Sequence, residues 1–166
     1  MRYLVAYYSL TGTTRRLAER TSQELGADIT EVTASRYRPG AVVFLRGVFD
    51  SWFGRLPPIE VRGPPTESYD FVLIMAPVWA GHASTPIRAY VAKNRGKFKR
   101  AGFVLTCGNW CLNSAFDEIT DLSGVKPEFA ATLRERLLRM SAYMPPTLAS
   151  FLTSLRLGGV GQYRSK

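Results

Sequence analysis

The stretch YYSLTGTTRRLAE, residues 7–19, connects an apolar run to a helical pattern through a short segment rich in hydroxyl groups. Residues 2–8 are mostly apolar, β-branched or aromatic, which is typical of a buried strand. From Leu17 to Leu25 apolar and small residues recur at helical spacing, and Gly26 stands where a C-terminal cap is expected. The stretch therefore predicts a strand, a tight turn and a helix in direct succession.

The turn between them has the composition of an anion site. A helix N-terminus presents unsatisfied backbone N–H groups and the positive end of the helix dipole. Gly12 lets the backbone approach a ligand closely, and hydroxyls that can donate to one terminal phosphate are carried by Ser9, Thr11, Thr13 and Thr14. No Gly-Lys-Ser/Thr pattern supports a nucleotide triphosphatase loop. The alternative is an ordinary helix start whose hydroxyls are incidental.

The rest of the chain repeats the alternation of strand and helix. Further strands are predicted at 27–32, 69–76, 101–106 and 128–133, and helices at 85–93, around 116–122 and at 145–157. Residues 40–54 are amphipathic and predict one more helix, followed by a proline-rich extended return. Five strands alternating with helices predict an α/β fold, a doubly wound parallel sheet in three layers, over residues 1–157. Residues 158–166 are predicted to be a flexible tail.

Three loops that follow apolar strands are expected to meet at one edge of this sheet, where such folds bind ligands. They are residues 9–14, 77–84 and 106–110. Trp79, beside Gly81, and Trp110 in the third loop could form aromatic walls for a flat ligand. Taken alone, a tryptophan such as Trp79 is equally well explained as a plug in the core.

Composition limits the partners and the compartment. A formal net charge of +9 on 166 residues favours anionic partners: a phosphate-bearing cofactor, an acidic protein, a lipid surface or nucleic acid. No nucleic-acid reading module accompanies the basic residues, so no specific nucleic-acid partner is predicted. The chain has two cysteines and no apolar run of about 18 residues, which favours a soluble, cytoplasmic protein without a membrane span.

The remaining histidine, cysteine and glycine motifs do not predict a catalytic or metal site. His82 is the only histidine, so a histidine-based triad or metal site is not supported; it is either a ligand contact or proton donor, or an exposed loop residue. Cys107 and Cys111 have no neighbouring ligands, and ordinary thiols are favoured over a redox disulfide or a thiolate role. The glycines from Gly158 onward follow no strand and do not predict a dinucleotide site.

Together the three loops resemble the flavodoxin family. SLTGTT matches the family's phosphate loop at Ser9, Thr11, Gly12 and Thr14, and PVWAGHASTPIRAY and VLTCGNW are similar to its second and third flavin loops. The resemblance implies strand order 2-1-3-4-5 and non-covalently bound FMN, with its ring near Trp79. The implied cofactor-binding residues are Ser9, Thr11, Gly12, Thr13, Thr14, Pro77, Val78, Trp79, Ala80, Gly81, His82, Thr106, Cys107, Gly108, Asn109 and Trp110.

The function that the resemblance implies is electron transfer. The protein is expected to act as a shuttle with a redox partner protein, or as an NAD(P)H-dependent reductase of a small acceptor such as a quinone. The flavin would supply the chemistry, and no side chain is an obligatory catalyst. The basic charge would stabilise an anionic reduced flavin and raise its potential. The alternative is a non-enzymatic basic binding module that kept the fold without flavin.

Overall fold

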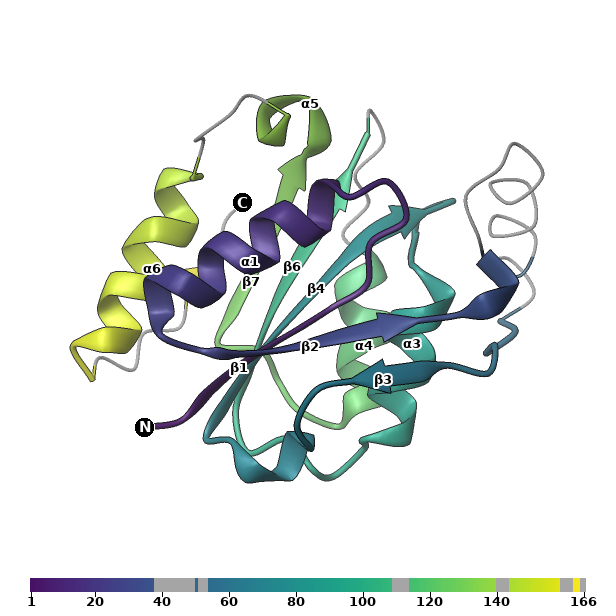
Figure 1. Ribbon diagram of the computed structural model, residues 1–166, viewed down its shortest axis with the longest axis horizontal. Coiled ribbons are helices and arrows are strands. Elements are labelled where there is room, and N and C mark those ends of the chain that lie inside the picture. The colour runs from purple at the N-terminus through teal and green to yellow at the C-terminus, as the bar shows by residue number, and fades with distance from the viewer. Residues whose placement is uncertain (38–49, 51–53, 109–113, 140–143, 159–162, 165–166) are drawn as a thin grey trace.

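The computed structural model describes residues 1–37, 50, 54–108, 114–139, 144–158 and 163–164 (Figure 1). Its centre is a parallel sheet of five strands: β1 (Tyr3–Tyr7), β2 (Asp28–Thr33), β4 (Phe71–Trp79), β6 (Ala101–Cys107) and β7 (Phe129–Arg134). They lie in the order β2-β1-β4-β6-β7. This confirms the predicted doubly wound sheet and its order 2-1-3-4-5.

Three short strands extend the sheet to eight, which corrects the predicted count of five. β3 (Glu60–Arg62) pairs antiparallel with β2, β5 (His82–Ala83) pairs antiparallel with β4, and β8 (Tyr163–Arg164) lies parallel to β7. None of them has an apolar pattern that the sequence could reveal, because each is three residues or shorter. β8 falls in the predicted tail, and the flexibility of residues 158–166 stays a prediction.

Helices cover both faces of the sheet, as the three-layer prediction requires (Figure 1). α1 (Thr13–Leu25) and α6 (Pro146–Arg156) lie on one face; α3 (Thr85–Lys93) and α4 (Ser114–Ser123) lie on the other. Short helical segments are η1 (Ser35–Tyr37), η2 (Thr66–Ser68) and α5 (Glu135–Leu138). The helix predicted within 40–54 falls mostly outside the described residues.

Alternate side chains of the strands supply two separate cores. In β1, Leu4 and Ala6 join the core under α3 and α4, while Val5 joins the core under α1 and α6. β4 is buried on both faces over almost its whole length, which is why it reads as one continuous apolar run. No helix among the described residues is long and apolar enough to cross a membrane.

The sheet has its switch point between β1 and β4. The chain leaves β1 toward β2 on one side, and β4 then pairs with β1 on the other side. Loops that leave β1 and β4 therefore diverge at the carboxyl edge, and such a crevice is where doubly wound sheets bind ligands. Residues 9–14, which follow β1, therefore lie at the ligand-binding edge of the sheet that the sequence analysis predicted.

Candidate functional site

The N-terminus of α1 is open to an anion. Gly12 is its N-cap, with φ of +86°, and no side chain caps the helix from this position. The Gly12 N–H donates to Ser9 Oγ at 3.1 Å, and a Cβ on Gly12 would have no heavy atom within 4 Å. The first turn contains no acidic residue, and Thr11 is exposed beside it. These features fit a phosphate at the helix N-terminus.

The other two threonines of the loop are turned inward. Thr13 and Thr14 are buried, and the Thr14 hydroxyl lies 2.9 Å from the hydroxyl of Thr106 at the end of β6. The structure therefore joins the first loop to the third through a direct hydrogen bond. Thr13 Oγ1 lies 3.5 Å from Thr11 Oγ1, within reach of the open end of the helix. Phosphate contacts by these threonines stay a prediction.

The second predicted loop is a tight hairpin. Pro77, Val78 and Trp79 belong to β4, and Trp79 pairs with His82 across a two-residue turn. Both turn residues, Ala80 and Gly81, have positive φ, at 50° and 86°. Two successive positive φ values suit a hairpin turn that follows the twist of the strands, and Ala80 adopts this conformation without being glycine. The sequence analysis predicted a ligand-binding loop here and did not predict the hairpin, because an Ala-Gly pair is a weak turn signal.

Trp79 packs as a core residue. Its exposed fraction is 6%, and its ring meets Tyr8 and Tyr37 edge-on, with centroid distances of 5.5 and 5.3 Å. The sequence analysis left open an exposed aromatic wall or a core residue, and in the structure Trp79 is a buried core residue. Contact between Trp79 and a flat ligand stays a prediction.

The tyrosines beside Trp79 sit in a polar cluster inside the protein. Tyr37 donates its hydroxyl proton to Asp50 Oδ2 at 2.8 Å and accepts from Thr85 at 3.0 Å. Burial alone would raise the pKa of Asp50, but hydrogen bonds from Tyr37 and Arg36 outweigh it and hold that pKa below its usual range. Burial raises the pKa of Tyr37, and burial together with repulsion from Tyr37 raises the pKa of Tyr8.

This burial predicts a loss of stability in alkali. Tyr8 stays protonated in the folded protein above pH 10, where it would ionise in the unfolded chain. The unfolded chain then binds fewer protons, so the free energy of unfolding falls as pH rises from about 10, by up to about 1.4 kcal/mol per pH unit for one tyrosine.

We expect Tyr8→Phe to flatten this slope in urea denaturations at pH 9 to about 11.5. The Tyr8 hydroxyl has no hydrogen-bond partner among the described residues, so the variant should be as stable as the parent near pH 8. An unchanged slope in Tyr8→Phe would contradict the assignment.

His82 belongs to a charged cluster that the sequence did not reveal. Its Nδ1 lies 3.4 Å from Oε1 of Glu118, and the same oxygen accepts from Arg88 Nη2 at 2.7 Å. Arg88 is buried and Glu118 is largely so, whereas the imidazole is 43% exposed. In addition, Ser114 donates to the Gly81 carbonyl at 3.3 Å. These contacts fix the hairpin to α3 and α4. The sequence carries no signal for the cluster, because Arg88 and Glu118 stand among ordinary helical residues.

The third loop is described only at its start. Thr106 and Cys107 are buried at the end of β6, Gly108 is exposed, and the predicted residues Asn109 and Trp110 lie outside the described residues. Pro77 is in register with Thr106, so the second and third loops begin side by side. Cys107 is disulfide-bonded, which corrects the preference for an ordinary thiol. Cys111 lies outside the described residues.

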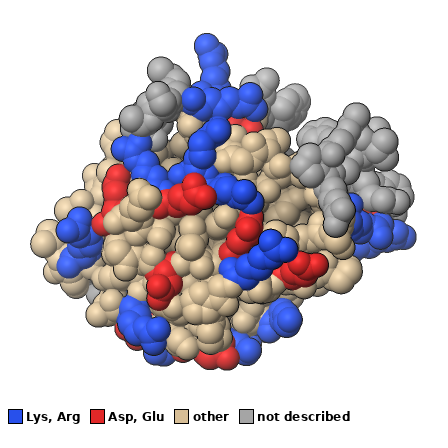
Figure 2. Space-filling view, viewed as in Figure 1, with Lys and Arg blue, Asp and Glu red and all other residues tan. Residues whose placement is uncertain are grey.

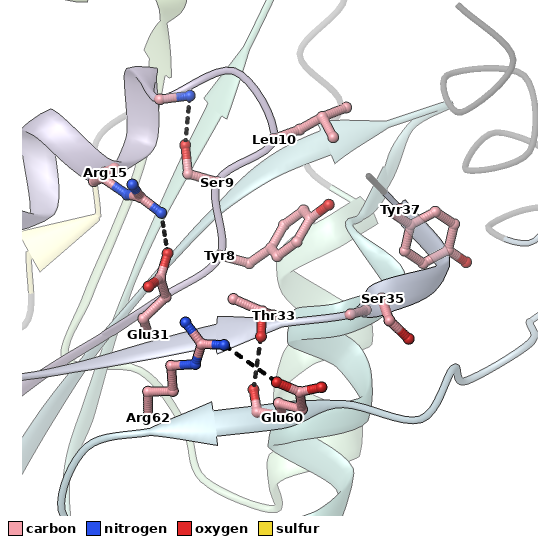
Figure 3. A pocket seen from close by; sticks show the side chains of 12 residues that line it. Tyr8, Ser9, Leu10, Arg15, Glu31, Thr33, Ser35, Tyr37, Glu60 and Arg62 are labelled. Atoms are coloured by element: carbon pink, nitrogen blue, oxygen red, sulfur yellow. Dashed lines mark hydrogen bonds and ion pairs between the residues drawn. The ribbon is translucent and has the colours of Figure 1, made fainter. Parts of the chain in front are cut away.

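A cavity of about 370 Å³ lies on the β2 side of residues 9–14 (Figure 3). Tyr8, Ser9, Leu10 and Gly12 form one wall, and Arg15 reaches from α1 to pair with Glu31 of β2. β3 contributes the Glu60–Arg62 pair at the rim, at 3.4 Å. None of the described residues of the predicted second and third loops lines this cavity. The second and third loops, which the resemblance assigns to the flavin ring, follow β4 and β6. These strands lie on the opposite side of β1 from β2, so the cavity is not where a flavin ring is expected.

Comparison with known proteins supports the architecture. No protein-family model matches the sequence, and no curated protein matches it. A flavoprotein from Lactobacillus acidophilus in complex with FMN is 21% identical, with a TM-score of 0.70 over 79% of this chain and 92% of that chain. A flavodoxin from Fusobacterium nucleatum bound to flavin mononucleotide is 12% identical, with a TM-score of 0.55 over 96% and 99% of the two chains. The apo form of an NADH:FMN oxidoreductase is 14% identical, with a TM-score of 0.55 over 95% and 90%. At these identities the likeness shows the fold, which is flavodoxin-like.

Proposed function

We propose that this protein binds FMN non-covalently and transfers electrons. The observation that carries the proposal is the N-terminus of α1, where a positive-φ glycine and the exposed Thr11 leave the backbone open to a phosphate at the switch point. Two of the structural neighbours, from L. acidophilus and F. nucleatum, hold FMN, and their shared fold supports the same class of ligand here.

The chain's own residues would bind and orient the cofactor. The phosphate would lie at the N-terminus of α1, beside the hydroxyls of Ser9 and Thr11, and the ring would lie over the hairpin and the start of the third loop. When bound, FMN would supply the reversible uptake of electrons, while the protein contributes position and charge. The Thr14–Thr106 hydrogen bond ties the phosphate side of the site to the ring side.

Two modes of electron transfer fit this arrangement. A reductase would take hydride from NADH or NADPH and pass it to a small acceptor such as a quinone; a shuttle would accept electrons from a partner protein. Oxidation of NAD(P)H by the FMN-loaded protein in the presence of a quinone supports the first mode. Reduction only by a partner reductase supports the second.

The alternative is a basic binding module of the same fold that carries no flavin. The burial of Trp79 between two tyrosine rings favours it, because this ring offers no exposed face to a flavin. Absorbance in the flavin bands separates the two proposals: the purified protein should be yellow or should become yellow when FMN is added.

Discrimination between FMN and riboflavin tests the phosphate site directly. Because the two flavins differ only by the phosphate, we expect FMN to bind at least about a hundredfold more tightly, which corresponds to about 2.7 kcal/mol. Thr11→Val should weaken FMN at least about tenfold and leave riboflavin unchanged, since it removes a hydroxyl near a charged ligand. Thr153→Val on α6, far from the loop, is the matched control. Flavin fluorescence titrations measure the affinity of each of the three proteins for both flavins, and equal losses for both flavins in Thr11→Val would contradict phosphate binding here.

A further inference from the structure

Five arginines gather at the carboxyl edge of the sheet, beside the phosphate loop. Arg15 and Arg16 lie in the first turn of α1; Arg134 ends β7, and Arg136 and Arg139 lie in and just after α5. We call this set the arginine rim. α1 and α5 contact one another, and Figure 1 shows α5 above the first turn of α1. Arg134 is in register with Cys107 at the end of β6, so the rim borders the proposed flavin site.

Most of the charge of the rim is not neutralised within the protein. Arg15 pairs with Glu31, and Arg139 pairs with Glu135 at 3.7 Å. The remaining three arginines are exposed and have no ion-pair partner among the described residues: Arg16, Arg134 and Arg136. The neighbouring stretches 109–113 and 140–143 contain no Asp or Glu that could pair with them. Figure 2 shows Lys and Arg side chains projecting at this end of the molecule.

The unpaired arginines of the rim are not explained by the stability of the fold. Cations in the first turn of a helix oppose its dipole, so Arg16, which has no ion-pair partner among the described residues, is unfavourable for α1 unless an anion lies near. Three unpaired arginines close together also repel one another. Such a concentration of like charge raises the local potential and steers oppositely charged molecules toward this edge.

An exposed apolar residue in the rim indicates what kind of anion fits. Leu137 is 43% exposed and stands between Arg136 and Leu138 on α5. A free phosphate or the phosphate of a nucleotide makes no favourable contact with an aliphatic side chain beside the arginines. Protein interfaces, in contrast, combine arginines with buried apolar anchors.

We propose that the arginine rim, with Leu137, is the docking surface for an acidic redox protein. Its carboxylates would meet Arg16, Arg134 and Arg136, and an apolar side chain would cover Leu137. The proposal rests on the proposed electron transfer only for what the partner does after docking; the docking itself does not require flavin.

The test uses an acidic [2Fe–2S] ferredoxin as the probe protein. Its binding to the full chain, with and without FMN, is measured by fluorescence anisotropy of the labelled ferredoxin at about 20 mM and about 200 mM NaCl. We expect binding at low salt that weakens at least about tenfold at the higher salt. Arg134→Gln/Arg136→Gln should weaken it about tenfold at low salt, and Leu137→Ser should weaken it without changing the dependence on salt.

The control removes the same net charge elsewhere. Lys93→Gln/Lys126→Gln takes two exposed cations from the end of α3 and from the segment before β7, so it should change the affinity less than about twofold. An equal loss in both double variants, or no binding at low salt, would overturn the proposal. Binding of duplex DNA or of phosphatidylserine vesicles through Arg134 and Arg136, without binding of the ferredoxin, would also overturn it. Docking without FMN uptake would refute only the proposed flavin function, and FMN uptake without docking would refute only this inference.

Discussion

We expect Arg88→Met to lower the free energy of unfolding by about 3 kcal/mol, because it leaves a largely buried carboxylate without its cation. Arg88 Nη2 lies 2.7 Å from Glu118 Oε1, with side-chain exposures of 9% and 19%. The other nitrogen near this oxygen, His82 Nδ1, is 3.4 Å away on a much more exposed side chain, so it cannot replace the guanidinium. Urea denaturation near pH 8 measures the effect.

The expected cost comes from the orphaned charge, and a second substitution can test this reason. Arg88→Met/Glu118→Leu removes both charges and should recover most of the lost stability. Arg62→Met breaks an exposed pair with Glu60, where both side chains are about two-thirds exposed, and should change stability by less than about 0.5 kcal/mol. If the double variant were as unstable as Arg88→Met alone, lost packing rather than the unpaired carboxylate would be the cause.

We expect Gly63→Ala to lower the free energy of unfolding by about 3 kcal/mol as well, for a steric reason. Gly63 follows β3 and has φ of +149°. A Cβ there would lie 2.8 Å from the Ile29 carbonyl oxygen and from Thr30 Cα, and closer still to Thr30 Oγ1. β2 cannot retreat, because Ile29 and Thr30 are in register with β1.

The matched control is another positive-φ glycine with free space. Gly96 has φ of +78°, and a Cβ there would meet nothing within 4 Å, so Gly96→Ala should cost only about 1 kcal/mol from backbone strain. Urea denaturation of both variants separates the steric contribution from the strain. Equal costs would show that β2 and the segment after β3 adjust to the added methyl group.

The sequence predicted the parts of the site that depend on local structure. SLTGTT predicted a helix N-terminus, and in the structure α1 begins directly after Gly12, which is the N-cap with φ of +86°. It could not show that Thr14 turns inward to Thr106, because that contact joins residues 92 positions apart. The sequence also could not show that Trp79 packs against Tyr8 and Tyr37, since the burial of a tryptophan depends on which side chains the fold places around it.

The sequence by itself determined the layers, because continuous apolar strands and amphipathic helices can be buried only as a sheet covered on both faces. The order of the strands came from the resemblance of the three loops to the flavodoxin family, since the apolar pattern alone does not specify it. The tertiary structure alone decided the charges and contacts around the loops. The Arg88–Glu118–His82 cluster joins three elements, and the arginine rim joins residues of α1 with residues more than 100 positions later. Hydrophobic periodicity specifies which face of an element is buried, whereas the pairing of polar side chains depends on distances between elements that only the folded chain sets.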